Sequence, residues 1–248
     1  GYPVVVKPDS GVGANNTYKL SSDSDLEFFM EHKDDEVYIM EEYVRGYVQT
    51  YDAIVDSKGQ PLFESGNISP RSIMDIVNEN TDSVYYLVKD LPAKIRSAGL
   101  RTVKAFGVKS RFIHLEFFVL TEDQEGLGKE GDVLGLEVNM RPAGGYTPDM
   151  YNYSQETDVY KIWADMVCFD TNTKPTGAHH FCAFYGRRDG TRYKLDDYEI
   201  MMKYAGHIVM NGRIPDALSG AMANQMYVAT FDTQEELDAF YRDLSEQL

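Results

Sequence analysis

The feature that most constrains the fold of this chain is a pair of apolar segments, residues 110–120 and 133–141, each interrupted by polar residues at alternate positions. Both segments are rich in residues that favour β-structure, and a glycine-rich polar turn separates them, so they are expected to pair as an antiparallel hairpin. Because side chains alternate across a strand, one face of the second segment is expected to hold a row of small and polar residues: Gly135, Glu137, Asn139 and Arg141.

Glu116 is the only acidic residue in the first segment, and it shares one strand face with His114. In the expected hairpin, Glu116 can come opposite Glu137 and Asn139. Burying a carboxylate is costly unless it is paired or bound to a cation, and neighbouring carboxylates repel each other. Carboxylate and amide oxygens are ligands that Mg²⁺ prefers. The pattern therefore favours a magnesium site of Glu116, Glu137 and Asn139, with an exposed ion pair between Glu137 and Arg141 as the alternative.

Composition excludes several other classes of protein. The 248 residues include 24 Lys+Arg and 40 Asp+Glu, a formal net charge of −16, so neither nucleic acid nor an anionic membrane is expected as a partner. The sequence contains no run of about 18 apolar residues that could span a bilayer. Two cysteines, Cys168 and Cys182, cannot form a disulfide scaffold, and the cytoplasm is the expected compartment.

The N-terminal end begins directly in an expected strand, residues 1–7, and residue 1 is Gly rather than Met. We therefore expect the sequence to be a fragment of a longer protein. Pro8 ends this strand, and residues 9–16 form a loop of small residues that exposes many backbone N–H groups.

Several helices are expected further along the chain. A capping box of Ser24 and Glu27 predicts a helix to about His32. Asp90 is expected to cap a helix that ends at Gly107, and residues 160–169 are expected to form a buried helix.

The region after residue 175 is expected to begin with a hairpin. Its strands are residues 181–185 and 193–195, which flank an Asp189-Gly190 turn. A final helix, capped by Thr233 and Glu236, is expected to bury one apolar face. The residues of that face are Leu237, Phe240, Tyr241, Leu244 and Leu248.

Taken together, these motifs resemble the ATP-grasp superfamily, and within it the carboxylate–amine ligases. The matches follow the order of that family and cover about residues 1–170. Four parts carry the resemblance: the strand of the phosphate-binding lysine (residues 1–8), the glycine-rich loop over the phosphates (10–16), the adenine-binding hinge (40–44), and the paired metal-binding strands (114–118 with 136–142).

The resemblance implies an α+β protein with the ATP-grasp fold, two α+β lobes with antiparallel sheets. It assigns residues 1–44 to the small lobe and 45–170 to the large lobe. Residues 171–248 remain as a small C-terminal α/β extension made of a hairpin and a helix.

The same resemblance implies roles for individual residues. Lys7 and Arg141 would be catalytic, with Lys7 neutralising phosphate charge and Arg141 facing the transferred phosphoryl group and the acyl intermediate. Mg²⁺, or Mn²⁺ in its place, would bind the three ligands named above. The residues that would contact ATP are Lys7, Ser10, Gly11, Gly13, Glu41, Glu42 and Val44.

The implied activity is an ATP-dependent ligase that joins a carboxylate to an amine, such as that of an amino acid, through an acyl phosphate. Its partners would be these small molecules, and a homodimer is one assembly the sequence allows. Two departures keep alternatives open: Val48 stands where many members have Glu, and the usual upstream lysine lies outside this sequence. The isolated fragment is therefore expected to be inactive. The alternatives are a non-catalytic nucleotide-binding regulatory module and a carboxylation enzyme resembling biotin carboxylase.

Overall fold

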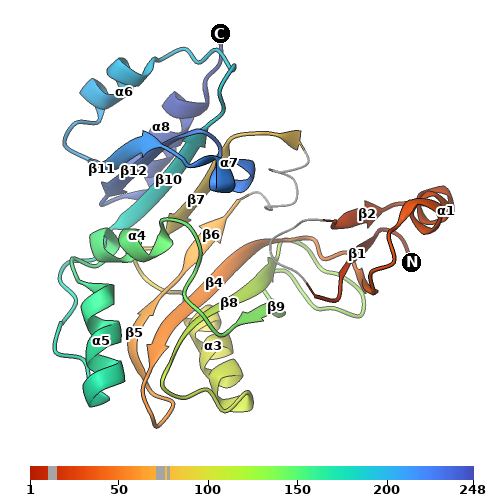
Figure 1. Ribbon diagram of the computed structural model, residues 1–248, viewed down its shortest axis with the longest axis horizontal. Helices are drawn as coiled ribbons and strands as arrows, with labels where there is room; N and C mark the ends of the chain where they lie inside the picture. The colour runs from red at the N-terminus through yellow and green to blue at the C-terminus, as the bar shows by residue number, and fades with distance from the viewer. Residues whose placement is uncertain (11–15, 71–75, 77–78) are drawn as a thin grey trace.

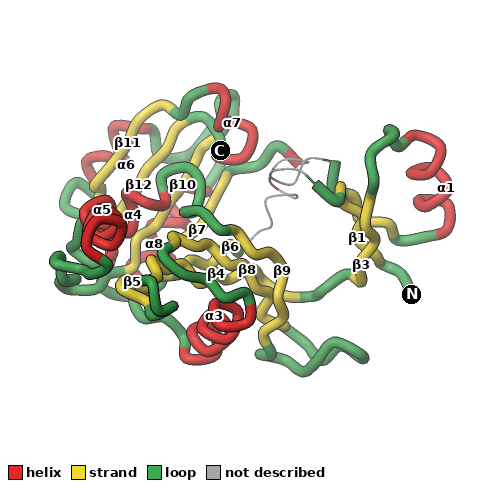
Figure 2. The backbone as a smooth tube through the Cα atoms, turned by 60° about the horizontal axis from the view of Figure 1, so that its bottom comes forward, coloured by secondary structure: helices red, strands yellow, loops and turns green. Residues whose placement is uncertain are grey.

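The computed structural model of the chain describes residues 1–10, 16–70, 76 and 79–248. Within these residues the strands form two sheets, one of three strands and one of nine. Every described strand pairing is antiparallel. Helices pack on both faces of the larger sheet (Figures 1 and 2). The predicted α+β class with antiparallel sheets is therefore confirmed.

The smaller sheet and one helix form a separate unit that carries the N-terminus and projects from the side of the larger sheet (Figure 1). Its strands, in the order β2-β1-β3, are β1 (Val4–Pro8), β2 (Tyr18–Leu20) and β3 (Tyr38–Glu42). Helix α1 (Asp23–His32) covers one face, and between them Val6, Leu20 and Phe29 form a small buried core. Lys7 alternates with Val6 along β1, so it lies on the opposite face of the sheet.

Helix α1 begins two residues before the predicted position. Ser22 is its N-cap: the backbone there is extended, and the hydroxyl oxygen accepts a hydrogen bond from the backbone N–H of Asp25 at 3.2 Å. Ser24 already lies in the first turn, where its hydroxyl contacts that of Ser22. The predicted capping box of Ser24 and Glu27 is therefore wrong, because the earlier serine takes the capping role.

The larger sheet runs in the order β11-β12-β10-β7-β6-β4-β8-β9, with β5 paired to β4. Its strands are β4 (Gly46–Val55), β5 (Pro61–Ser65), β6 (Asn67–Ser69), β7 (Ser83–Leu87), β8 (Arg111–Leu120), β9 (Val133–Asn139), β10 (Phe181–Arg187), β11 (Ile208–Arg213) and β12 (Gln225–Phe231). The sheet thus continues across residue 170, and the division of the chain at 44 and 170 stays a prediction.

The helices that cover this sheet are α3 (Ala93–Ala105), α4 (Thr147–Ser154), α5 (Val159–Phe169), α6 (Asp197–Lys203), α7 (Asp216–Met222) and α8 (Gln234–Ser245). On one face, α3 packs against Tyr51 and Ile113. On the other, α4 and α5 pack against Ile54 and Phe112. Since side chains alternate along β4, Asp52 lies on the same face as Ile54, the one covered by α4 and α5.

The expected helix near residue 90 begins at Ala93 instead. Pro92 occupies the N-cap position, and no side chain caps the helix. Asp90 lies too far from the first turn to serve, so its predicted capping role is wrong. The helix predicted at 160–169 is confirmed as α5, with Asp158 as its N-cap. It buries only one face, because Tyr160, Val167 and Phe169 are exposed, so the prediction of a buried helix is wrong in that respect.

The predicted hairpin at Asp189-Gly190 does not form. Strand β10 continues to Arg187 and pairs with β7 and β12, while Tyr193 makes only an isolated bridge to Gln247. The Asp189 carboxylate instead pairs with both terminal nitrogens of Arg213, at 2.7 and 2.5 Å, which ties this turn to β11.

Helix α8 covers the C-terminal strands through Leu237, Phe240 and Leu244. Its predicted capping box of Thr233 and Glu236 is confirmed. The helix ends at Ser245, so Leu248 lies beyond it with 87% of its surface exposed, and its predicted place on the apolar face is wrong.

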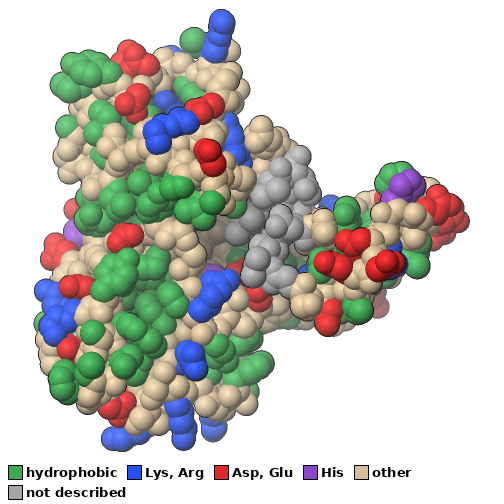
Figure 3. Space-filling view, viewed as in Figure 1, with side chains coloured by type: hydrophobic (Ala, Val, Ile, Leu, Met, Phe, Trp, Pro, Cys, Tyr) green, Lys and Arg blue, Asp and Glu red, His purple; other side chains and the backbone are tan. Residues whose placement is uncertain are grey.

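Acidic side chains are prominent on the projecting unit, whereas hydrophobic side chains spread over the larger part of the molecule (Figure 3). Across the described residues, no helix combines the length and the apolar character needed to cross a membrane.

Candidate active site

The two predicted metal-binding strands pair as expected. Glu116 of β8 lies directly opposite Glu137 of β9, and His114 lies opposite Asn139. Directly opposed residues of antiparallel strands project from the same sheet face. The structure therefore brings Glu116, Glu137 and Asn139 together, and the predicted hairpin is confirmed.

A bulge changes the row of polar residues on β9. The register shifts between Glu116 and Phe117, which leaves Leu136 as the extra residue and places Gly135 opposite Phe117. A bulge of this kind interrupts the alternation of side chains. The prediction that Gly135 shares one face with Glu137 is therefore wrong, and the polar row begins at Glu137.

A buried hydrogen-bond chain runs behind Glu116. The Asp52 carboxylate, fully buried on β4, accepts from His114 Nδ1 at 2.5 Å and from the Thr50 hydroxyl at 2.6 Å. On its other side, His114 Nε2 lies 3.1 Å from Glu116 Oε1. The backbone N–H of Asn67 donates to the Thr50 hydroxyl at 2.9 Å, which extends the chain to β6.

The charges around the hydrogen-bonded residues favour a protonated His114 imidazole. Burial by itself would lower the pKa of His114, but the neighbouring carboxylates of Asp52 and Glu116 outweigh it and raise that pKa to about 10. The Tyr151 hydroxyl, from α4, lies beside Asp52 without the geometry of a hydrogen bond, and burial raises its pKa well above the ordinary value. Sequence reasoning placed His114 beside Glu116 but missed Asp52, whose one signal is a lone acidic residue in the apolar run of β4.

The donor set fits a hard divalent cation. Glu137 is exposed, and its side chain forms no hydrogen bond or ion pair within the part of the chain that the structure describes, so its carboxylate oxygens are available. Asn139 Nδ2 is buried without a partner among those residues, so this donor could bind a phosphate oxygen, while the amide Oδ1 is the atom that could face a cation. No cluster of three or more His, Cys, Asp or Glu side chains suited to a metal occurs there, so Mg²⁺ would complete its shell with phosphate and water oxygens.

Lys7 and Glu41 come together on the smaller sheet. Lys7 Nζ lies 2.5 Å from Glu41 Oε2, and their side chains are 27% and 50% exposed. The two residues were predicted to contact different parts of ATP, phosphates and adenine. In this structure the ammonium group is neutralised by that carboxylate.

The segment between β3 and β4 is held by the side chain of Gln124, from the loop between β8 and β9. The Gln124 side chain accepts from the backbone N–H of Arg45 at 2.6 Å and donates to the carbonyl of Tyr43 at 3.1 Å. These two contacts lie on either side of Val44. The backbone N–H and C=O of Val44 form no hydrogen bond with the described part of the chain. Glu42, the last residue of β3 and part of the predicted hinge, is exposed. Sequence reasoning missed Gln124, because no local pattern links it to a segment 79 residues away.

Two predicted residues, Arg141 and Ser10, make no described contact with either group. Arg141 is exposed and donates to the carbonyl of its neighbour Pro142 at 3.0 Å. Ser10 is exposed at the end of the described part of its loop. Gly11 and Gly13 lie outside the described residues. No described hydrogen bond or ion pair joins Lys7 to Glu116 or to Glu137.

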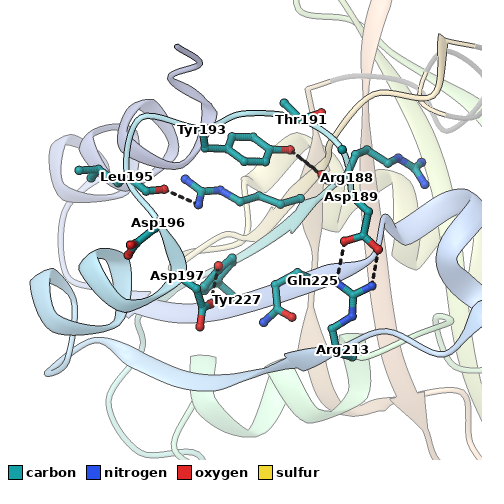
Figure 4. A pocket seen from close by; sticks show the side chains of 12 residues that line it. Arg188, Asp189, Thr191, Tyr193, Leu195, Asp196, Asp197, Arg213, Gln225 and Tyr227 are labelled. Carbon is teal, nitrogen blue, oxygen red and sulfur yellow. Dashed lines mark hydrogen bonds and ion pairs between the residues drawn. The ribbon is translucent and has the colours of Figure 1, made fainter.

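A cavity of 480 Å³ lies elsewhere, among the C-terminal strands (Figure 4). Its most buried cation, Arg187, stacks on Tyr193 with 4.1 Å between the guanidinium carbon and the ring centre. The Arg187 guanidinium donates to the carbonyls of Leu195 and Leu244, at 2.8 and 3.0 Å. Through the carbonyl of Leu244 this guanidinium helps to hold α8 against the sheet.

No protein-family model matches the chain, and no curated protein matches it in sequence. Solved structures do. An L-amino acid ligase from Bacillus licheniformis superposes with a TM-score of 0.66 at 17% identity, over 98% of this chain and 63% of that one. The N5-carboxyaminoimidazole synthetase from Staphylococcus aureus, complexed with ADP, gives 0.64 at 12% identity, over 98% and 61%. The chain has the ATP-grasp fold.

A third solved ATP-grasp structure is the biotin carboxylase domain of 2-oxoglutarate carboxylase from Hydrogenobacter thermophilus, a dimer in complex with MgADP. It superposes with a TM-score of 0.60 at 12% identity, over 98% of this chain and 56% of that one. The chain thus spans between 56% and 63% of the length of these three proteins. At such identities the likeness establishes the ATP-grasp fold alone.

Proposed function

We propose that the chain is the nucleotide-binding part of an ATP-dependent ligase that joins a carboxylate to an amine. The observation that carries this proposal is the placement of Glu116 directly opposite Glu137, with Asn139 next along the same face. Oxygen ligands of this kind suit Mg²⁺, and they occur here in the fold of an L-amino acid ligase.

In this proposal Glu116, Glu137 and Asn139 hold Mg²⁺, for which Mn²⁺ could substitute. The bound cation would offset negative charge on the β- and γ-phosphates of ATP. The MgADP complex of the Hydrogenobacter thermophilus domain supports this choice of metal and nucleotide.

The smaller sheet and the hinge would hold the nucleotide. Lys7 would exchange its contact with Glu41 for a phosphate oxygen, while Ser10 of the following loop offers a backbone N–H to phosphate, together with Gly11 and Gly13. Glu41, Glu42 and the free backbone groups of Val44 would face the adenine edge. A protein of net charge −16 can bind ATP in this way, because contact distances and local cations decide the affinity.

The chemistry has two steps. In the first step a carboxylate oxygen attacks the γ-phosphorus, and the bond from that phosphorus to the β–γ bridging oxygen breaks. The products are an acyl phosphate and ADP. The amine then attacks the acyl carbon, the carbon–oxygen bond to phosphate breaks, and the nitrogen gives up a proton. Arg141 follows directly after the metal-binding strand, and its planar guanidinium suits a phosphoryl or carboxylate group.

The cytoplasm is the proposed compartment, and small molecules rather than nucleic acids or membranes are the proposed partners. The strongly acidic composition supports this choice of partners. A homodimer is the proposed assembly, supported by the dimeric Hydrogenobacter thermophilus domain. Sedimentation of the chain with and without Mg²⁺–ATP tests it.

Mg²⁺–ATP binding tests the site directly. Glu137→Gln removes one anionic ligand from an exposed side chain that makes no described contact, so stability should change little. Affinity for Mg²⁺–ATP, measured by calorimetry, should fall about 10- to 100-fold. Glu125→Gln, an equal change in charge in the exposed β8–β9 loop, is the matched control and should bind as wild type. Equal affinities of the two variants would contradict the metal assignment.

ADP release tests the reaction. Carboxylates, amines and bicarbonate are screened singly and in pairs against the full-length protein. ADP formation that needs both a carboxylate and an amine supports the ligase. ADP formation with bicarbonate alone favours the carboxylation alternative, and nucleotide binding without turnover favours the regulatory alternative. The isolated chain is expected to release little ADP.

A further inference from the structure

The hydrogen-bond chain behind Glu116 ends at a side chain that is itself accessible. Asp52 is fully buried, the His114 side chain is 11% exposed, and that of Glu116 is 21% exposed. The chain therefore leads from the interior of the sheet to the edge of the candidate metal site.

Each member of the chain limits the freedom of the next. The Asp52 carboxylate is fixed on one oxygen by the Thr50 hydroxyl, at 2.6 Å, and its other oxygen receives His114 Nδ1. With Nδ1 held, the imidazole ring cannot turn, and Nε2 points at Glu116 Oε1. Only Oε1 of Glu116 is engaged in this way, so Oε2 keeps both lone pairs for another ligand.

The backbone supports the same geometry. Asp52 lies opposite His114 in the β4–β8 register, and Glu116 is the next residue on that face of β8. All three side chains thus lie on one face of the sheet: Asp52 and His114 face each other across β4 and β8, and Glu116 lies in the next row, opposite Glu137 of β9. Side chains on strands of a sheet are placed more rigidly than those on loops.

We propose that His114, oriented by Asp52, is a positioning residue that fixes the Glu116 carboxylate so that its second oxygen faces the divalent cation. The inference rests on the proposed function, since it assumes that Glu116 is a metal ligand. Partners that orient metal ligands are commonly needed for full metal affinity. His114 itself touches neither the cation nor the nucleotide.

Two variants separate the two hydrogen bonds of the ring. His114→Asn keeps a donor near the position of Nδ1, and thus the contact with Asp52, but is too short to reach Glu116. His114→Gln keeps a donor near the position of Nε2 and loses the contact with Asp52. His180→Asn, at an ion-paired histidine away from the site, is the matched control.

The experiment measures binding of Mn²⁺ by electron paramagnetic resonance in the presence of a non-hydrolysable ATP analogue, and binding of the analogue alone in EDTA. His114→Asn should bind Mn²⁺ about 10- to 100-fold more weakly than wild type, with unchanged affinity for the metal-free analogue. His114→Gln should recover part of the Mn²⁺ affinity, and the control should match wild type. Such a split distinguishes positioning of the metal ligand from general damage to the fold.

Unchanged Mn²⁺ affinity in His114→Asn would overturn the inference, as would an equal loss of metal-free analogue binding. If His114→Asn does not fold, an NMR measurement on His114 in the wild-type protein tests the inference. The Nε2 resonance of His114 in ¹⁵N-histidine-labelled protein should shift when Mg²⁺ is added with the analogue, and a constant resonance would overturn the inference. Failure of wild type to bind Mn²⁺ would instead overturn the proposed function, and the inference with it.

Discussion

At the scale of single residues, Lys7, proposed to bind phosphate, already has a partner in this structure. Its ammonium group pairs with Glu41 at 2.5 Å on the sheet face that α1 does not cover. Both side chains are partly exposed, and such pairs contribute only about 0.2–1 kcal/mol to stability. In the proposed complex Lys7 would exchange this weak pair for phosphate oxygens, which also accept charge-assisted hydrogen bonds.

Lys7→Ala should therefore lower affinity for Mg²⁺–ATP while leaving the fold intact. A hydrogen bond to a charged group is worth about 1.5–3 kcal/mol, or roughly 10- to 100-fold in the dissociation constant. Calorimetry gives the affinity and thermal unfolding gives the stability. Lys58→Ala, in the β4–β5 turn, is the control and should leave both quantities unchanged. Wild-type ATP affinity in Lys7→Ala would remove Lys7 from the site.

At the scale of secondary-structure elements, the contact between α3 and β4 depends on a glycine. A Cβ atom on Gly99 would lie 2.2 Å from Cγ of Tyr51. The Tyr51 ring cannot move aside, because it is fully buried and its hydroxyl donates to Glu64 at 2.8 Å. Close approach of helix and sheet is therefore the reason for a glycine in the middle of this helix.

Two Gly→Ala substitutions should change stability in opposite directions. Alanine raises helix propensity by about 1 kcal/mol, but overpacking a buried contact costs about 1–3 kcal/mol. Gly99→Ala should thus destabilise the protein by up to about 2 kcal/mol. Gly220→Ala in α7, where a Cβ atom meets nothing within 4 Å, should stabilise it. Denaturant unfolding measures both, and a stabilised Gly99→Ala would contradict the packing described here.

The elements that sequence patterns predicted well are those whose signals are local. The hairpin of β8 and β9 and the capping box of Thr233 and Glu236 each depend on residues close in sequence. The hairpin at Asp189-Gly190 failed because a distant residue, Arg213, binds the Asp189 side chain. The contact between Asp52 and His114 spans 62 residues and depends on strand register, which alternation within one strand does not specify.

At the scale of the whole molecule, the linker from Tyr43 to Arg45 connects the smaller sheet to the larger one, and several residues of the β8–β9 loop bind it. Gln124, in the loop between β8 and β9, binds the backbone on both sides of Val44. The backbone N–H of Thr121 also donates to the carbonyl of Arg45, at 3.1 Å. The orientation of the projecting unit is therefore tied to the same hairpin that carries Glu116 and Glu137.

Gln124→Ala should make the projecting unit less firmly fixed to the β8–β9 hairpin. It removes two hydrogen bonds of about 0.5–1.5 kcal/mol each, so the two sheets should sample a wider range of separations. If Mg²⁺–ATP binds to one arrangement of the sheets, its affinity should fall in proportion to the smaller population of that arrangement. Fluorescence energy transfer between labels on α1 and α3 measures the distribution of distances, and calorimetry measures Mg²⁺–ATP affinity. Glu122→Ala, which removes only the exposed ion pair with Arg45, should leave both as in wild type. A distance distribution in Gln124→Ala as narrow as that of wild type would mean that contacts other than Gln124 fix the projecting unit.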